Sequence, residues 1–235
     1  MIYACADIHG RKDKFDRLLG KISLQRDDKL IIIGDVIDRG PDGIILLQEM
    51  MANPQFLLML GNHEYMMLNA VEHSKDFMTI RRWYNNGGQV THQAFLELSE
   101  DKQNEIIRYL QSLPVNLSVK ASGREYLLVH GSPMNCFSRN DVKYLDAIEY
   151  SVWERIQVNM NVPDHQTIVF GHTPTNRYRG SDLPMKIWHG KGLIGIDCGC
   201  AFAEYGGQLG CICLDTLEEY YSDIDDEKEE LRDEG

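Results

Sequence analysis

The sequence predicts an α/β protein built around a parallel sheet, and three observations support this prediction. The chain has 235 residues, of which 43% are hydrophobic and 26% charged, so it can bury a full core. Its first half alternates short apolar runs with segments of helical periodicity, which is the pattern of βαβ units. Each apolar run of that half ends in glycine and polar residues, as strands do where a parallel sheet carries its site.

The first sixty residues predict three strands separated by two helices. Apolar side chains recur at helical spacing from Lys12 to Ile22, and Ile44 to Ala52 predicts the second helix. The expected strands are Ile2 to Ala6, Lys29 to Ile33 and Phe56 to Leu60.

The rest of the chain predicts a helical middle followed by a strand-rich second half. The helical region runs from Tyr65 to Leu113 and ends before Pro114, and another helical stretch is expected from Asp141 to Ile156. Strands are expected at residues 115–120, 126–129, 168–170, 193–196 and 210–214. We see no repeat or linker, so we expect one domain, residues 1–221, and an acidic tail, residues 222–235.

Charge and hydropathy exclude several classes of partner. The formal net charge is −12, and the tail holds eight acidic residues against two basic ones. An acidic protein repels the phosphate backbone, so we expect no nucleic-acid partner. The apolar runs are far shorter than the roughly 18 residues that span a bilayer, and no signal peptide is visible. We therefore expect a cytoplasmic protein without a membrane partner, whose oligomeric state the sequence does not indicate.

Four of the six cysteines form two Cys-x-Cys pairs, Cys198/Cys200 and Cys211/Cys213. On a strand, both thiols of such a pair point to one face of the sheet. A four-cysteine zinc site is one interpretation, but structural zinc sites prefer two to four residues between their ligands. We favour the other interpretation, in which these are small apolar residues in a core hairpin.

Polar residues with metal-binding side chains follow five of the predicted strands. Because the carboxyl ends of parallel strands meet at one edge of a sheet, these residues should converge. Their oxygen and nitrogen donors suit Mn²⁺, Fe or Zn²⁺ better than Ca²⁺. One bridging carboxylate can hold two ions about 3.5–4 Å apart, which activates water against phosphorus. The candidate ligands are Asp7, His9, Asp35, Asn62, His130 and His172.

The ordered motif series resembles that of the calcineurin-like metallophosphoesterases. The series is Asp-x-His-Gly, Gly-Asp-x-x-Asp-Arg-Gly, Gly-Asn-His-Glu, and then His-Gly and Gly-His. The second and third motifs are similar to those of the phosphoprotein phosphatase branch. Trp83, residues 152–155 and residues 170–174 resemble the bacterial and phage members of the lambda phosphatase type. The resemblance implies a β-sandwich core flanked by helices, a four-layer αββα arrangement.

The resemblance also implies the metal ligands. Asp7 and His9 would hold the first ion, and Asp35 would bridge it to the second. The remaining ligands of the second ion would be Asn62, His130 and His172. Of the metals that this donor set suits, we expect Mn²⁺, with Fe or Zn²⁺ as alternatives.

Four further residues would act on the substrate. His63 would be the general acid, oriented by Asp38, and histidine titrates in the range that this role needs. Arg39 and Arg155 would hold the phosphoryl oxygens, because guanidinium groups match their geometry.

These residues lead us to expect a serine/threonine protein phosphatase, in which metal-activated water attacks phosphorus in line. Pro174 stands where nucleases and phosphodiesterases of the superfamily carry the second histidine of Gly-His-x-His.

The main alternative is a symmetric dinucleoside polyphosphate hydrolase. That group usually ends the third motif in aspartate, whereas this chain has Glu64 there and Asp38 before Arg-Gly. A non-catalytic phosphopeptide-binding module should have lost ligands or the acid. The substrate would be a phosphorylated protein or a small phosphoester. The sequence does not indicate whether the enzyme prefers phosphoserine and phosphothreonine or phosphotyrosine.

Overall fold

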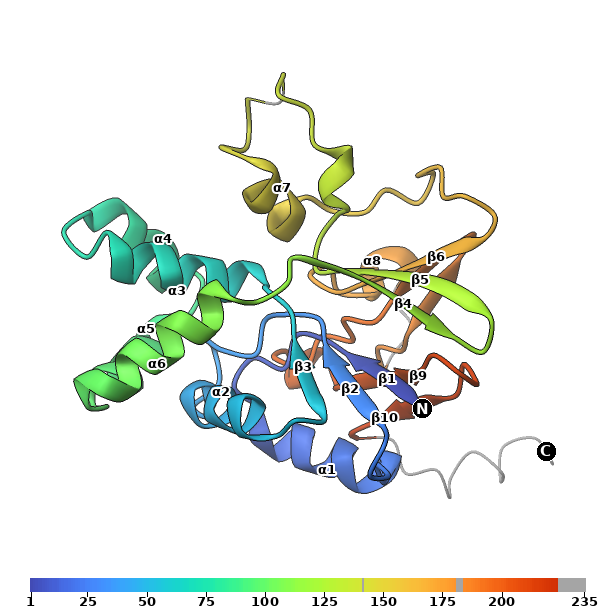
Figure 1. Cartoon of the computed structure of the whole chain (residues 1–235), viewed down its shortest axis with the longest axis horizontal. Helices are drawn as coiled ribbons and strands as arrows, with labels where there is room; N and C mark the ends of the chain where they lie inside the picture. The colour runs from blue at the N-terminus through green and yellow to red at the C-terminus, as the bar shows by residue number, and fades with distance from the viewer. Residues whose placement is uncertain (141, 181–183, 224–235) are drawn as a thin grey trace.

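Two five-stranded sheets pack face to face in the computed structural model, which describes residues 1–140, 142–180 and 184–223 (Figure 1). The first sheet has the order β10-β9-β1-β2-β3, and the second has the order β4-β5-β6-β8-β7. The first half of the chain therefore supplies most of one sheet, and the second half supplies the other.

The first sheet has a parallel centre and an antiparallel edge. The strands β1 (Ile2–Cys5), β2 (Lys29–Ile32) and β3 (Phe56–Leu58) pair in parallel, as predicted. The strands β9 (Gly210–Cys213) and β10 (Glu219–Tyr221) add to β1 in antiparallel register. The carboxyl ends of the three parallel strands thus lie at one edge of the sheet.

The second sheet is also mixed. Its strands β5 (Arg124–Val129), β6 (Gln166–Phe170) and β8 (Leu193–Gly195) pair in parallel. The hairpin strand β4 (Asn116–Ala121) and the short β7 (Trp188–Gly190) pair antiparallel at its two edges.

Successive side chains along β1 point into two different hydrophobic cores. Tyr3 and Cys5 face the helices α1 (Lys12–Ile22) and α2 (Gly43–Ala52), which lie below the first sheet in Figure 1. Ala4 faces the other way, into the core between the two sheets. The predicted sandwich is therefore confirmed.

The fourth layer of the αββα arrangement, the helical layer outside the second sheet, is thin. The outer face of the second sheet is covered by the one-turn helix α8 (Asn176–Arg179), whose Tyr178 ring stacks on Trp188 at 4.8 Å. Phe170 of β6 meets both rings edge-on.

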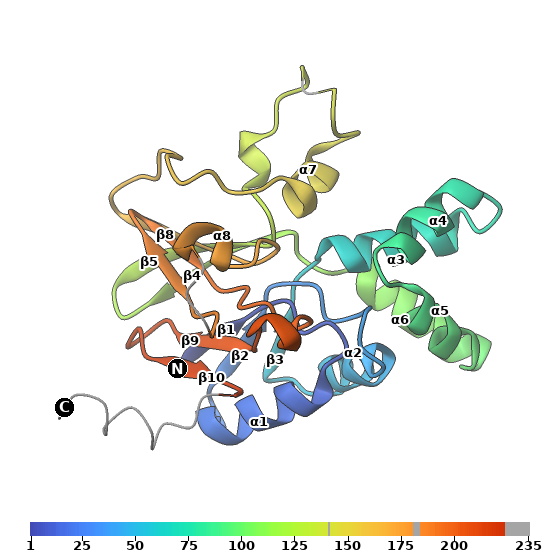
Figure 2. The ribbon, with the colours of Figure 1, turned by 180° about the vertical axis from the view of Figure 1, so that it is seen from behind.

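Two groups of helices project from the sandwich, and both lie toward the side where the site forms (Figures 1 and 2). The first, the helical arm, consists of α3 (Asn62–Glu72), α4 (Phe77–Asn85), α5 (Gln89–Leu96) and α6 (Glu100–Gln111). The second, the α7 lobe (described residues 134–140 and 142–153), begins with a short 3₁₀ turn and contains α7 (Ala147–Trp153).

Most predicted elements are confirmed to within two or three residues at each end, but two predictions are wrong. Of the helix expected from Asp141 to Ile156, Asp141 lies outside the described residues, and the observed helix spans Ala147–Trp153, where Asp146 caps it by accepting from the N–H of Ile148 and of Glu149. Cys198 and Cys200 lie in the loop after β8 and face different cores, so their side chains do not share a strand face. The strands β7 and β10 and the helix α8 were not predicted.

In the part of the chain that the structure describes, no cysteine belongs to a group of potential metal ligands. All six are free, and Cys211 and Cys213 of β9 are buried in the helix-side core. This agrees with the apolar interpretation.

No helix in the described ranges is long and apolar enough to cross a bilayer. Of the predicted tail, the structure describes only Ser222 and Asp223; residues 224–235 lie outside the described part of the chain.

Candidate active site

The site forms where five strands end. Asp7 and His9 follow β1, Asp35 follows β2, His130 follows β5, and His172 follows β6 by one residue. Asn62 and His63 begin α3, which starts after a three-residue connection from the end of β3. The predicted convergence of these clusters is confirmed in geometry, since the two sheets present their carboxyl ends to a common space.

Left-handed backbone conformations are concentrated at this site. Nine non-glycine residues of the described chain have a positive φ angle, and six of them are predicted site residues. Such conformations cost of order 1–3 kcal/mol each and persist only where the surroundings enforce them. The six are Asp7, His9, Asp35, Asp38, Arg39 and His172, with φ between 51° and 71°.

Two glycines leave room for the carboxylates. A Cβ atom on Gly171 would lie 2.4 Å from Asp7 Oδ2, and one on Gly61 would lie 2.3 Å from Asp35 Oδ1. Any side chain at either position would push the carboxylate out of place.

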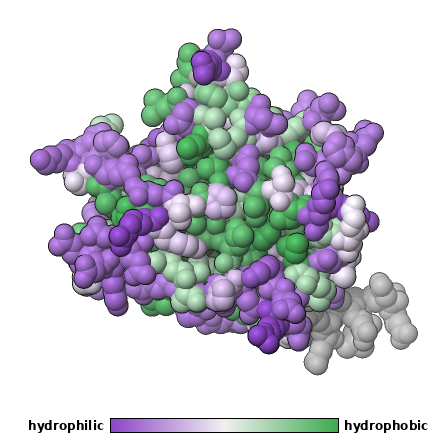
Figure 3. All heavy atoms as spheres, in the orientation of Figure 1, coloured by the Kyte–Doolittle hydropathy of each residue, from purple (hydrophilic) through white to green (hydrophobic). Residues whose placement is uncertain are grey.

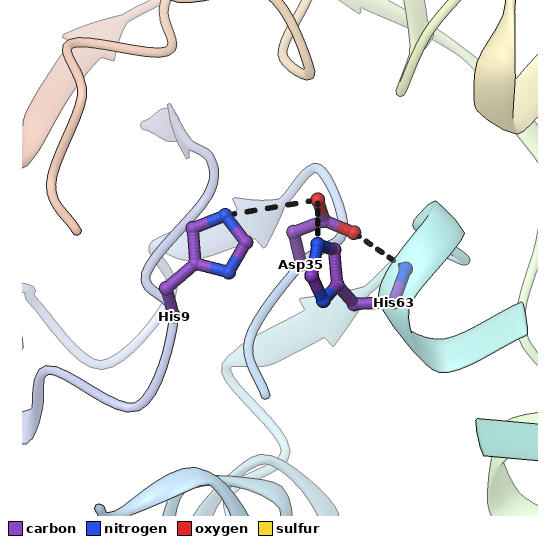
Figure 4. A group of neighbouring side chains, drawn as sticks. All are labelled: His9, Asp35 and His63. Carbon is purple, nitrogen blue, oxygen red and sulfur yellow. Dashed lines mark hydrogen bonds and ion pairs between the residues drawn. The ribbon is translucent and has the colours of Figure 1, made fainter. Parts of the chain in front are cut away.

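Asp35 lies at the centre of the site (Figure 4). Its Oδ2 is 3.8 Å from His9 Nε2, 3.8 Å from His63 Nε2 and 3.4 Å from His130 Nε2. Its Oδ1 accepts the backbone N–H of His63 at 2.9 Å, at the amino end of α3. Burial alone would raise the pKa of Asp35, but the neighbouring His130 and His63 hold it well below its usual range. One carboxylate oxygen of Asp35 therefore faces three imidazoles.

The Asp35 loop is held by Glu64. This fully buried carboxylate accepts the N–H groups of Asp35 at 2.8 Å, Val36 at 2.9 Å, Ile37 at 3.3 Å and Gly61 at 3.1 Å. Burial, followed by the charge of Asp35, raises the pKa of Glu64 to about 7. We did not assign a site role to Glu64 from the sequence, although it ends the Gly-Asn-His-Glu motif.

Backbone carbonyls orient three of the histidines. His9 Nδ1 is 3.2 Å from the carbonyl oxygen of Ile37, and His130 Nδ1 is 2.8 Å from that of Ile33. His172 uses its other nitrogen, Nε2, which is 3.1 Å from the carbonyl oxygen of Trp153. A carbonyl oxygen only accepts, so each of these nitrogens carries hydrogen and the other ring nitrogen faces the site.

The second group of candidate ligands fits a cation. Asn62 Oδ1 is 2.9 Å from His130 Nε2 and 2.8 Å from His172 Nδ1. Burial, followed by the charge of His130, lowers the pKa of His172 to about 3, so its Nδ1 is an unprotonated acceptor facing another acceptor. Burial would also lower the pKa of His130, but the carboxylates of Asp35 and Asp7 raise it to about 10. A proton on His130 thus supplies positive charge where a metal ion would supply it.

Two sets of donor atoms share Asp35. In the described chain, ligand atoms of His9, Asp35 and His63 lie within 4.8 Å of one another, and so do those of Asp35, His130 and His172. The two sets overlap at one carboxylate, which matches the arrangement expected for two metal ions. The first set contains His63 where we expected Asp7.

Asp7 lies beside these sets. Its two carboxylate oxygens accept the backbone N–H of His172 at 3.2 and 3.0 Å, and it lines the same cavity as His9 and Asp35. Asp197 also lines this cavity and is buried. Burial, followed by the charge of Asp197, raises the pKa of Asp7 well above its usual range, and burial raises that of Asp197 to about 6. Three buried carboxylates around one cavity favour a bound cation.

His63 has the geometry of an oriented acid. Its Nδ1 is 2.6 Å from Asp38 Oδ2, and that oxygen also accepts the indole N–H of Trp83 at 2.8 Å. His63, Asp38 and Trp83 are all at most 1% exposed. The predicted pairing of His63 with Asp38 is therefore present, and Trp83 of α4 is an additional partner of Asp38 that we had noted only as a motif residue.

The two predicted arginines line the cavity. The Arg39 guanidinium donates from Nη1 to His9 Nε2 at 2.9 Å and from Nη2 to His63 Nε2 at 3.2 Å, and its Cζ lies 5.1 Å from the Phe202 ring centre. Arg155 donates to Thr173 Oγ1 at 3.1 Å. Neither guanidinium has a carboxylate partner among the contacts of the described residues, so both can bind an anion.

Comparison with known proteins identifies the family. Residues 1–193 match the family model of the calcineurin-like phosphoesterases. The chain therefore belongs to this family of dinuclear metal-dependent hydrolases and is a phosphoesterase.

The curated relatives fall into two groups. The chain is 27% identical to serine/threonine-protein phosphatase 2 of Salmonella typhimurium over 73% of this chain and 78% of that protein. It is 32% identical to the Escherichia coli protein of the same name, over 55% of this chain and 57% of that one. It is also 28% identical to the symmetrical bis(5'-nucleosyl)-tetraphosphatase of Delftia acidovorans, over 74% of this chain and 57% of the relative. The chain thus spans little more than half the length of two of these three proteins.

Solved structures share the fold. A structure provisionally described as a diadenosine tetraphosphatase has a TM-score of 0.62 and 20% identity, with 94% of this chain and 91% of that chain covered. A serine/threonine phosphatase from Saccharomyces cerevisiae has a TM-score of 0.58 and 18% identity, with coverages of 89% and 71%. At these identities the likeness supports the fold alone.

Proposed function

We propose that this phosphoesterase is a serine/threonine protein phosphatase that uses two divalent metal ions. The observation that carries the proposal is the buried His63–Asp38 pair beside Asp35 and Arg39. This places an oriented proton donor, a carboxylate able to bridge two ions and a guanidinium around one cavity. The cytoplasm stays the compartment that we expect from the sequence.

Six side chains would hold the metal ions: Asp7, His9, Asp35, Asn62, His130 and His172. When bound, two such ions activate water for in-line attack on phosphorus and neutralise the phosphoryl oxygens. The nitrogen and oxygen donors suit Mn²⁺, with Fe or Zn²⁺ as alternatives.

Arg39 has to change partners during the reaction. In this structure its guanidinium occupies the lone pairs of His9 Nε2 and His63 Nε2. A phosphoryl group offers oxygens that match the guanidinium geometry better than two ring nitrogens do. Drawing Arg39 onto the phosphoryl group would free His63 Nε2 to carry the proton that the leaving oxygen needs. Arg155, which lines the same cavity, would bind the same group.

Two observations favour a protein substrate. The Salmonella phosphatase is matched over 78% of its length, whereas the Delftia tetraphosphatase is matched over 57%. Glu64, rather than aspartate, ends the third motif and reaches four backbone N–H groups. The second candidate, a symmetric dinucleoside polyphosphate hydrolase, is supported by the 28% identity to the Delftia enzyme.

The proposal is tested by a panel of metals and substrates. Purified protein is assayed with a phosphoserine peptide, a phosphotyrosine peptide and diadenosine tetraphosphate, each with Mn²⁺, Mg²⁺ and Zn²⁺. We expect the phosphoserine peptide with Mn²⁺ to give the highest kcat/KM. Preferential release of nucleoside diphosphate from the dinucleotide would replace the proposal by the second candidate.

The same panel tests His63. We expect His63→Asn to lower kcat on the phosphoserine peptide by about 10²–10⁴-fold while bound metal stays near normal. p-Nitrophenyl phosphate should be affected less, because its leaving group needs no proton. His73→Asn, at an exposed histidine of the same helical arm, is the matched control. Unchanged turnover of phosphoserine by His63→Asn would remove His63 from the mechanism.

A further inference from the structure

A second hollow adjoins the active-site cavity, between α4 and the α7 lobe. Trp153, Arg155 and His172 line both hollows, so the two lie side by side. Arg82 of α4 and Lys143 of the lobe lie on the far walls. A substrate with its phosphoryl group at His63 and Asp35 would therefore extend along this second hollow.

The hollow is cationic in an acidic protein. Among the residues that the structure describes, Arg82, Lys143 and Arg155 line it together with one carboxylate, Glu149, although the chain has a formal net charge of −12. Lys143 is neutralised by Glu154, 2.9 Å away. The two arginines are then the groups that can hold an anion.

Glu149 leaves Arg82 able to bind further. The Glu149 carboxylate is 5% exposed and is shared between Arg82 Nη1 at 2.8 Å and the N–H of Leu145 at 2.9 Å. Arg82 Cζ lies 4.6 Å from the Trp153 ring centre, which fixes the plane of the guanidinium. The Trp153 ring covers one face of the Arg82 guanidinium, and Glu149 accepts from one of its edges. Because a guanidinium has five N–H donors, others remain to bind an anion.

Arg82 is placed close to the metal-binding residues without belonging to them. The Trp153 ring on which it lies is 6.0 Å from the His172 ring, and the Trp153 carbonyl accepts from His172 Nε2. An anion bound by Arg82 would thus be a short distance along the substrate from the scissile phosphate.

Exposed apolar residues next in sequence to the lining residues Lys143, Tyr144 and Glu149 suit a polypeptide substrate. Val142 and Leu145 of the α7 lobe are almost fully exposed, at 101% and 87%, and Ile148 on α7 is 38% exposed. Figure 3 shows green, apolar atoms on the lobe at the top of the view. An extended peptide can contact these apolar residues while it places one acidic side chain in the cationic hollow.

We propose that this hollow binds an acidic side chain of the phosphoprotein substrate near the phosphorylated residue, and that Arg82 determines this preference. The inference rests on the proposed function and names a sequence preference within it. A tetraphosphate substrate would place a second phosphate in the same hollow, and the test separates that case.

The test compares two phosphoserine peptides that differ only in glutamate or glutamine two residues from the phosphoserine, on either side. We expect the wild-type protein to favour the acidic peptide by roughly fivefold in kcat/KM, mostly through KM. Arg82→Gln should bring this ratio close to one. The ratio is the readout, so a general loss of activity cannot imitate the result.

Two further variants serve as controls for this comparison. The double variant Arg82→Gln/Glu149→Gln removes the buried Glu149 charge together with its partner. If Arg82→Gln folds poorly, the double variant should still lose the preference for the acidic peptide. Arg81→Gln, the exposed neighbour on α4, should keep it.

Three results would overturn the inference. They are an equal wild-type rate on both peptides, a preference that survives in the Arg82 variants, and an equal loss in Arg81→Gln. Absence of any phosphopeptide turnover beside rapid cleavage of diadenosine tetraphosphate would instead overturn the proposed function, and the acidic-peptide inference with it.

Discussion

Glu64 is the residue on which the shape of the active-site loop depends most. Its two carboxylate oxygens accept four backbone N–H groups from two segments, and three of these N–H groups belong to the loop that carries Asp35. Asp35 itself is held with a positive φ angle, so its position relies on these bonds.

Replacing Glu64 by glutamine keeps the side-chain size but leaves a single acceptor oxygen and adds an NH₂ group that faces donors. We expect Glu64→Gln to lower the free energy of unfolding by about 2–4 kcal/mol and to weaken metal binding. Urea unfolding and metal titration measure both. Glu72→Gln, at an exposed position of the same helix, is the control. Equal unfolding midpoints for Glu64→Gln and the wild type would contradict this role.

The sequence predicted which residues come together better than it predicted the contacts between them. Of the ten predicted residues, seven line one cavity, His63 and His130 contact its lining residues, and Asp38 contacts His63, because most of the motifs place them after strands. Asp197 follows β8 in the same way, and that position after an apolar run was a usable signal. The hydrogen bonds between Glu64 and the backbone of the Asp35 loop could not be predicted, because they depend on how two loops pack together.

The helical arm supports the chemistry through Trp83 of α4. This fully buried indole donates to Asp38 Oδ2, the oxygen that also orients His63. Thr91 of α5 adds a second bond from the arm, since its hydroxyl oxygen accepts the N–H of Asp38. The arm therefore fixes Asp38, the partner of the proposed acid His63, as well as bordering the second hollow.

Phenylalanine in place of Trp83 would fill most of the space but remove the donor. We expect Trp83→Phe to lower kcat on a phosphoserine peptide by about tenfold and the free energy of unfolding by about 1–2 kcal/mol. Trp188→Phe, in β7 on the far side of the second sheet, should change stability without a matching loss of kcat. If both variants lose the same activity, Trp83 acts only through packing.

Elements with strong apolar periodicity were predicted well, and short or edge elements were not. The α1 helix has the predicted bounds, because Phe15, Leu18 and Ile22 define a buried face. The strands β7 and β10 have three residues each and pair at sheet edges, where tertiary pairing rather than local pattern decides the structure. The pairing of β9 with β1, across almost the whole chain, has no local signal at all.

The carboxyl end of the described chain is bound to α1. Lys14 is 3% exposed, and its ammonium group donates to the Gly207 carbonyl at 2.7 Å and to Asp223 at 2.6 Å. Gly207 belongs to the loop that also carries Phe202, which contacts Arg39. Asp223, the second residue of the predicted tail, is thus bound to the domain.

Removing residues 224–235 should leave the unfolding temperature and p-nitrophenyl phosphate turnover nearly unchanged, because no site residue lies there. Asp223→Asn should lower the free energy of unfolding by about 1–2 kcal/mol, since it leaves the buried Lys14 without its charged partner. Thermal denaturation of the two proteins makes the comparison. A strong rise in activity on truncation, reproduced by salt in the full chain, would show that the tail inhibits the site.

At the scale of the molecule, the site exists only because both sheets present strand ends to one space. Asp7, His9 and Asp35 come from the first sheet, and His130 and His172 come from the second. The central claim is that Asp35 joins these halves through two metal ions. It predicts a specific arrangement that does not depend on which substrate the enzyme prefers.

The most direct test is the anomalous diffraction of crystals grown with Mn²⁺. We predict two manganese peaks about 3.5–4 Å apart, with the Asp35 carboxylate in contact with both. Asp7 and His9 should lie at the first peak, and Asn62, His130 and His172 at the second. A single peak, or two peaks of which neither touches Asp35, would contradict the account.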